Sequence, residues 1–174
     1  MTNTDKGMFY FDILEGFFRN KIKYLIVGGV AINLYGVPRM TQDLDIIISM
    51  EPDNIRQMNQ TLHKLGYVPR LPVEADDLAD PQKVKSWIEE RNLTAFSYYH
   101  QDEIYKVIDI ILNHPLSFGE AFAKKIIRQA SGIEVYLASV ADIIKMKQGT
   151  GRDQDESDIK MLRDKNIRWE NENG

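Results

Sequence analysis

Two aspartates inside an otherwise apolar strand segment constrain this chain more than any other feature. Asp43 and Asp45 lie in TQDLDIIIS, residues 41–49, among leucine and isoleucine. Because side chains two positions apart in a strand lie on the same face, both carboxylates are predicted to project together. Like charges buried side by side are costly unless a cation compensates them. The segment therefore predicts a cation-binding or tightly paired site on a core strand.

A third aspartate has the same kind of surroundings. Asp109 is the single charged residue of VIDII, residues 107–111. If its strand lies beside that of Asp43 and Asp45, three carboxylates converge on one patch, and such oxygen-rich sites suit Mg²⁺ or Mn²⁺. A D-x-D pair alone is a weak pattern. Its alternative interpretation is an exposed strand end whose carboxylates form hydrogen bonds with a loop.

The glycine pair Gly28-Gly29 follows a predicted buried strand, residues 23–27, and opens a predicted short helix, residues 30–35. A turn of this kind exposes backbone N–H groups that can bind phosphate. The spaced glycines of dinucleotide-binding proteins and the Walker pattern are both missing from the sequence. Taken alone, the pair is also typical of a tight turn with close packing. Beside the acids, it predicts a phosphate site next to a metal site.

The rest of the chain predicts one domain with mixed α and β structure. Apolar spacing and capping residues predict helices at 8–19, 52–65, 82–91, 117–127, 139–148 and 155–163, and strands at 94–100, 105–112 and 133–137, the first two as a hairpin. The acidic segment 69–81, interrupted by prolines, is predicted to be a mobile loop. A chain of 174 residues is expected to form a single domain, residues 1–165, with a polar C-terminal tail at 166–174.

Composition excludes several classes of protein. The chain has no cysteine, so no disulfide or thiolate site is available. No apolar run reaches the roughly 18 residues of a membrane helix, and the N-terminal residues lack the pattern of a signal peptide. A net charge of −4 argues against broad non-specific binding to nucleic acid. We therefore expect a cytoplasmic protein that is not associated with a membrane.

The residues Gly28-Gly29, Arg39 and TQDLD at 41–45 together resemble the signature of the nucleotidyltransferase superfamily. That signature is a strand, a Gly-Gly or Gly-Ser turn, a helix and a strand that carries D-x-D. The form is most similar to the AbiEii-type branch, bacterial proteins often found as toxins of toxin–antitoxin pairs. VIDII resembles the third-acid strand, and residues 139–162 resemble the closing helices. Two positions depart from the pattern: Gly29 replaces a common serine, and Gln154 replaces a usual lysine.

The resemblance implies a nucleotidyltransferase fold of the α/β (α+β) class, a small mixed β-sheet flanked by helices. It implies a metal-dependent enzyme that moves a nucleoside monophosphate from an NTP to a hydroxyl acceptor. Asp43, Asp45 and Asp109 would be catalytic and would bind two Mg²⁺ or Mn²⁺ ions. The residues that would bind the nucleotide are Gly28, Gly29, Arg39, Thr41, Lys145 and Lys147.

Several side-chain roles stay open at the level of sequence. Arg39 either stabilises phosphate charge or pairs with an acid. Lys145 and Lys147 point to opposite sides of a helix, so at most one of them reaches the triphosphate, with Lys145 slightly favoured. The alternative for both is a solvated helix edge. Asp155 and Asp158 share a helix face and are predicted mainly as surface acids.

The acceptor also stays open. It is RNA, a protein or a small molecule, the last as in antibiotic-modifying nucleotidyltransferases. The toxin interpretation implies a cognate antitoxin protein as partner. A module on the same fold that binds a nucleotide or a partner without catalysis is the remaining alternative.

Overall fold

A computed structural model describes the backbone of residues 10–173 and the side chains of residues 10–166. The elements follow one another along the chain as α1 (Phe11–Arg19), β1 (Tyr24–Val27), α2 (Gly28–Leu34), β2 (Leu44–Ile48), α3 (Pro52–Lys64), β3 (Tyr67–Pro69), η2 (Ala75–Ala79), α4 (Pro81–Arg91), β4 (Ala95–His100), β5 (Val107–Ile111), α5 (Phe118–Ala123), β6 (Ile126–Ala130), β7 (Ile133–Leu137), α6 (Val140–Lys147) and α7 (Asp153–Asn173).

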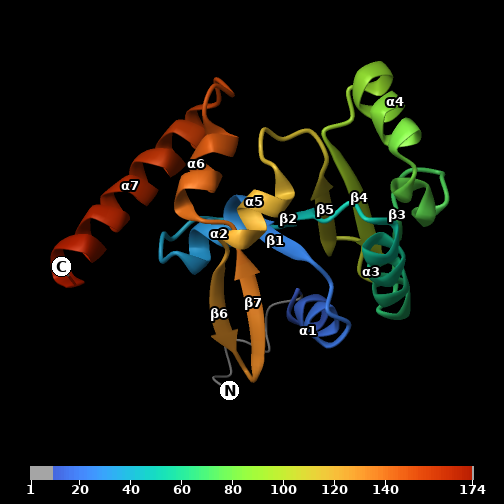
Figure 1. The fold of residues 1–174 in the computed structure, drawn as a ribbon, viewed down its shortest axis with the longest axis horizontal. Coiled ribbons are helices and arrows are strands. Elements are labelled where there is room, and N and C mark those ends of the chain that lie inside the picture. The colour runs from blue at the N-terminus through green and yellow to red at the C-terminus, as the bar shows by residue number, and fades with distance from the viewer. Residues whose placement is uncertain (1–9, 174) are drawn as a thin grey trace.

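The strands form one seven-stranded mixed sheet in the order β3-β4-β5-β2-β1-β7-β6. The pairs β1–β7 and β2–β5 are parallel, and the others are antiparallel, including the predicted β4–β5 hairpin. Figure 1 shows α6 and α7 at one end of the molecule and α3 and α4 at the other. The predicted fold class, a mixed sheet flanked by helices, is confirmed.

The two central strands are the most deeply buried part of the sheet. All four residues of β1 are buried, and Leu44, Ile46 and Ile47 of β2 have no exposed surface. Each buried side chain of this size stabilises the folded state by about 1.5–3 kcal/mol. The apolar residues around Asp45 therefore hold its strand in the core, and this buried strand fixes the position of the carboxylate.

Two strands are missing from the sequence-based prediction. The helix expected at 117–127 ends at Ala123, and β6 follows it as an edge strand paired with β7. Ser131 and Gly132 connect these strands with φ of 49° and 83°. Two positive φ values in a two-residue connection are the geometry of a type I′ hairpin turn. The short β3 was also missed, because three residues give no readable alternation.

The acidic segment 69–81 is not a free loop. It contains the 3₁₀ helix η2, and Leu78 at its centre is 1% exposed. Asn59 Nδ2 of α3 donates a hydrogen bond to Asp76 Oδ1 at 2.8 Å, and Tyr98 OH donates to Asn59 Oδ1 at 2.5 Å. The prediction of a mobile loop is therefore wrong for the conformation seen here, since the segment is fixed to α3 and β4.

The last helix is longer than predicted. Helix α7 continues to Asn173, through the residues that were expected to form a polar tail, so its predicted end at residue 163 is wrong. The division into a domain at 1–165 and a tail stays a prediction. Within residues 10–173, no helix is long and apolar enough to cross a membrane.

Candidate active site

Two of the three predicted acids lie side by side at the centre of the sheet. Asp45 on β2 and Asp109 on β5 occupy the same register position of a parallel strand pair. Residues in register point to the same face, so the two half-buried carboxylates project together. Asp43 lies just before β2 rather than inside it, because the strand begins at Leu44 and not at residue 41. The structure therefore brings Asp45 and Asp109 together, with Asp43 beside them outside the strand.

Burial and the neighbouring acids raise the pKa of Asp45 and of Asp43. Burial, together with the charges of Asp109 and Asp43, raises the pKa of Asp45 from 3.8 to about 7, although Lys147 and Arg39 act in the opposite direction. Burial and the charge of Asp109 also raise the pKa of Asp43. A carboxylate that resists ionisation beside another acid is typical of a site that a cation completes.

The donor set fits a cation that arrives with phosphates better than one held by the protein alone. Among the side chains of residues 10–166, no three His, Cys, Asp or Glu are arranged to hold a metal ion. Mg²⁺ is commonly bound by one or two carboxylates together with the phosphates of a substrate. The carboxylates of Asp45 and Asp109, which are neighbours in the sheet, suit that mode, and Asp43 stands near enough for its charge to act on Asp45.

The glycine turn is packed directly against these acids. Gly28 has φ of +65°, and a Cβ built on it would collide with the carboxylate of Asp45. A Cβ at Gly29 would collide with the guanidinium of Arg39 and lie 2.6 Å from Thr41 Oγ1. The first position thus requires glycine for its backbone conformation and both require it for space. The two glycines therefore allow the turn to pack directly against Asp45, Arg39 and Thr41.

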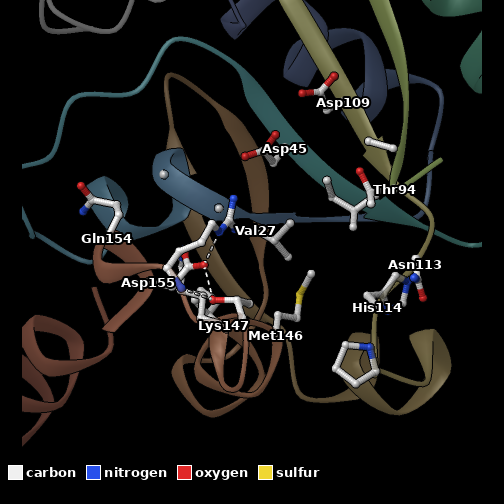
Figure 2. Close-up of a pocket in the computed structure, with 18 of the residues that line it drawn as sticks. Val27, Asp45, Thr94, Asp109, Asn113, His114, Met146, Lys147, Gln154 and Asp155 are labelled. Atoms are coloured by element: carbon white, nitrogen blue, oxygen red, sulfur yellow. Dashed lines mark hydrogen bonds and ion pairs between the residues drawn. The ribbon is translucent and has the colours of Figure 1, made fainter. Parts of the chain in front are cut away.

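A cavity of about 560 Å³ opens next to the acids, between the sheet and helices α6 and α7. Its size is within the usual range for a small-molecule site. Figure 2 shows Lys147, Gln154 and Asp155 on one side and Thr94, Asn113 and His114 on another, with Asp45 and Asp109 at one end. The predicted site residues that line it are Gly28, Gly29, Arg39, Asp45, Asp109 and Lys147.

The predicted site residues outside this lining are Thr41, Asp43 and Lys145. Lys145 is exposed on α6, whereas Lys147, two positions later on the same helix, lines the cavity. This placement is contrary to the slight preference for Lys145. The two lysines do point in different directions, as the helical spacing requires.

Lys147 is held by two buried acids of α7. Its Nζ lies 2.9 Å from Asp155 Oδ1 and 3.0 Å from Asp158 Oδ2. Asp155 is 2% exposed and Asp158 is 0% exposed, so their prediction as surface acids is wrong. Spacing alone could not have found them, because an i, i+3 acid pair on a surface helix has the same pattern.

Two arginines complete the network on this side of the cavity. Arg39 Nε lies 3.3 Å from Asp158 Oδ1, so the arginine pairs with an acid of α7 while lining the cavity. Arg152 Nε donates to Asp155 Oδ2 at 2.7 Å. Burial disfavours the charge of Asp155, but hydrogen bonds from Thr150, Lys147 and Arg152 outweigh it and lower its pKa. Three cations share two carboxylates here, so this side keeps one positive charge in excess and offers guanidinium donors that suit phosphate oxygens.

The other side of the cavity is uncharged, and sequence reasoning missed it. Thr94, Asn113 and His114 line it together with Ile111. The backbone N–H of Leu116 donates to His114 Nδ1 at 3.2 Å, and burial lowers the pKa of this histidine. A neutral imidazole whose Nδ1 accepts a hydrogen bond carries its proton on Nε2. The sequence did offer one signal for this side: Asn113 and His114 are polar residues that come directly after the strand of the third acid.

A mixed sheet that places a Gly-Gly turn and two strand acids beside a cavity lined by lysine and arginine is the architecture expected of a nucleotidyltransferase. The chain belongs to the family described as nucleotidyltransferase of unknown function (DUF6036), whose model matches residues 16–165. The superfamily predicted from the sequence is thereby confirmed, and the finer AbiEii-type branch stays a prediction. No curated protein sequence matches the chain.

Solved structures with the same fold include two antibiotic-modifying enzymes. The lincosamide antibiotic adenylyltransferase LnuA, bound to lincomycin, matches with a TM-score of 0.58 and 18% identity over 94% of this chain and 97% of that chain. ANT(2")-Ia in complex with adenylyl-2"-tobramycin matches with a TM-score of 0.50 and 14% identity over 87% and 83% of the two chains. At these identities the likeness shows a shared fold.

Proposed function

We propose that this protein transfers a nucleoside monophosphate from an NTP to a hydroxyl group of a small molecule, with a divalent cation bound alongside the nucleotide. The observation that carries the proposal is the arrangement of Asp45 and Asp109 in register between a cationic and a neutral side of one cavity. Family membership supports nucleotidyl transfer, and the two antibiotic adenylyltransferases support a small acceptor.

The cationic side is the place for the triphosphate. Lys147, Arg39 and Arg152 would neutralise its oxygens, and the backbone N–H groups at Gly28 and Gly29 would approach it closely. A divalent cation between the acids and the phosphates would reduce the charge that repels an attacking oxygen. Lys147 is fixed by two buried acids, so little reorganisation of the protein accompanies binding.

The transfer itself is an in-line substitution at the α-phosphorus. The acceptor hydroxyl oxygen forms a new bond to that phosphorus, and the bond to the bridging oxygen breaks, releasing pyrophosphate. The hydroxyl proton passes to a carboxylate, for which Asp109 is our candidate because it borders the neutral side of the cavity. Asp43, Asp45 and Asp109 would bind the cations, Mg²⁺ or Mn²⁺, for which two ions are the prediction.

The neutral side is the place for the acceptor. Thr94, Asn113 and the Nε2–H of His114 offer hydrogen bonds beside Ile111, the combination that binds a polar organic molecule. A small acceptor also suits the volume of this cavity, which is that of a small-molecule site. The toxin interpretation and its antitoxin partner have no support in the comparisons. Growth arrest on expression, abolished by Asp43→Asn, would restore that interpretation.

The first test is calorimetric binding of non-hydrolysable NTP analogues with and without Mg²⁺, for the wild type, Asp45→Asn and the exposed-site control Asp102→Asn. We expect Mg²⁺-dependent binding in the wild type and the control, and its loss in Asp45→Asn. Pyrophosphate release is then measured with each NTP and a panel that includes lincosamides, aminoglycosides and simple polyols. Firm binding without release for any acceptor would favour the non-catalytic module, and binding that ignores Mg²⁺ and Asp45 would refute the proposal.

A further inference from the structure

A hydroxyl group on β4 is bonded to one of the two paired acids. Ser97 Oγ donates a hydrogen bond to Asp109 Oδ1 at 2.5 Å, and both residues are half-buried. Ser97 lies opposite Asp109 in the antiparallel β4–β5 register, and Asp109 lies opposite Asp45 in the β5–β2 register. Residues opposite one another share a face, so the three side chains form one row across the sheet.

The backbone of Ser97 is held on both sides of its strand. It is paired with β5 on one side, and its C=O accepts a hydrogen bond of 2.9 Å from the backbone N–H of Arg70 on the other. The hydroxyl is therefore attached to a fixed point of the sheet rather than to a loop. Within the described residues, Asp109 has no other side-chain hydrogen-bond donor, and Asp45 has none.

This hydrogen bond leaves the two oxygens of Asp109 unequal. Oδ1 accepts the Ser97 proton, and Oδ2 remains for a cation or an acceptor hydroxyl. A carboxylate bound in this way favours coordination through one oxygen and opposes the symmetric mode in which both oxygens hold one ion. Mg²⁺ requires octahedral coordination with short bonds, which favours monodentate carboxylates, whereas the larger Ca²⁺ accepts a bidentate carboxylate.

We propose that Ser97 is a positioning residue that restricts Asp109 to one-oxygen coordination, so that the site selects Mg²⁺ over Ca²⁺. The inference rests on the proposed function, because the cation considered is the one that accompanies the NTP. Ser97 acts through Asp109 and touches neither the nucleotide nor the acceptor.

The test is calorimetric binding of a non-hydrolysable ATP analogue in MgCl₂ or in CaCl₂ to the wild type and to Ser97→Thr, Ser97→Val and Ser97→Ala. Threonine and valine have the same shape and differ in the hydroxyl, so this pair isolates the hydrogen bond. Tyr99→Phe removes a hydroxyl from the same face of the same strand and serves as the matched control.

We expect Ser97→Val and Ser97→Ala to weaken Mg²⁺-dependent binding about 10- to 100-fold, the range for partners that orient metal ligands, and to weaken Ca²⁺-dependent binding much less. Ser97→Thr and Tyr99→Phe should keep the wild-type ratio of the two affinities. This ratio does not depend on the amount of folded protein in a preparation, so a partly unfolded variant still reports it.

Three results would overturn the inference while leaving the proposed function intact: unchanged Mg²⁺ affinity in Ser97→Val and Ser97→Ala, equal losses for both cations, or a threonine variant as weak as the valine variant. A merely structural hydrogen bond predicts the second result. A wild-type protein whose ATP-analogue binding depends on neither cation would instead overturn the proposed function, and this inference with it.

Discussion

Asp45→Asn is expected to stabilise the protein in the absence of ligand, and increasingly so as the pH rises. The pKa of Asp45 is raised from 3.8 to about 7 in the folded protein. An acid whose folded pKa is above its unfolded value contributes its full stability below the unfolded pKa and loses it as the pH rises through the folded pKa. The wild type should therefore lose stability between about pH 4 and pH 7.

The magnitude follows from that interval. At 1.36 kcal/mol per pH unit, the interval corresponds to a cost of at most about 4 kcal/mol for the ionised carboxylate above pH 7. Asparagine is neutral at every pH and has nearly the same shape, so it avoids this cost. We expect a gain of about 2–4 kcal/mol at pH 8 for Asp45→Asn and a difference near zero at pH 4.

Urea unfolding between pH 4 and pH 8.5, at low protein concentration and without divalent cations, measures this difference. Asp102→Asn, an exposed acid of the β4–β5 connection, is the control and should show no such trend. Mg²⁺ and a non-hydrolysable NTP should reduce or cancel this difference, because a ligand at 1,000 times its Kd stabilises its target by about 4.1 kcal/mol, and the variant is expected not to bind it. A variant no more stable than the wild type at pH 8, or a gain independent of pH, would refute the reasoning.

Three further substitutions test separate parts of the structure. Gly28→Ala should cost about 1–3 kcal/mol of stability from its left-handed backbone alone, as measured by urea unfolding. Its Cβ would also collide with Asp45, so we expect calorimetry to show no nucleotide binding. A stable variant that still binds would contradict the packing described. Lys147→Met should destabilise by about 1–3 kcal/mol because the buried carboxylates of α7 lose their shared lysine and keep only their arginine partners. Thermal unfolding that matches the wild type would argue against that network. Tyr98→Phe should cost about 1–3 kcal/mol and speed hydrogen exchange in residues 70–80, since Asn59 loses its donor, and unchanged exchange would show that the segment is held by other contacts.

The features predicted well from the sequence are those whose physics is local. A charge in an apolar strand is conspicuous at Asp45 and at Asp109, and the two acids were expected to converge if their strands were neighbours. The structure brings these two together in register. Gly28 was equally visible, because a glycine between a strand and a helix has few structural explanations. A charged residue in a core strand is contrary to the usual apolar pattern of such strands, and this can be recognised without knowledge of the fold.

The features that were missed depend on partners far away in the chain. Asp155 and Asp158 look like surface acids until α7 packs on α6 and meets Lys147. Ser97 is one polar residue of an ordinary alternating strand until β4 pairs with β5 and sets it against Asp109. Neither contact produces a recognisable residue spacing in the sequence, because tertiary packing determines how distant elements are aligned.

The parallel pairing of β2 with β5 also determines when the protein becomes able to bind. Asp45 meets Asp109 after the chain has passed through α3, β3, α4 and β4, so the acid pair is a product of long-range closure. Lys147 gains its two carboxylates later still, from α7. A chain emerging from the ribosome is therefore expected to complete the cavity only after α7 has been made and has packed against α6.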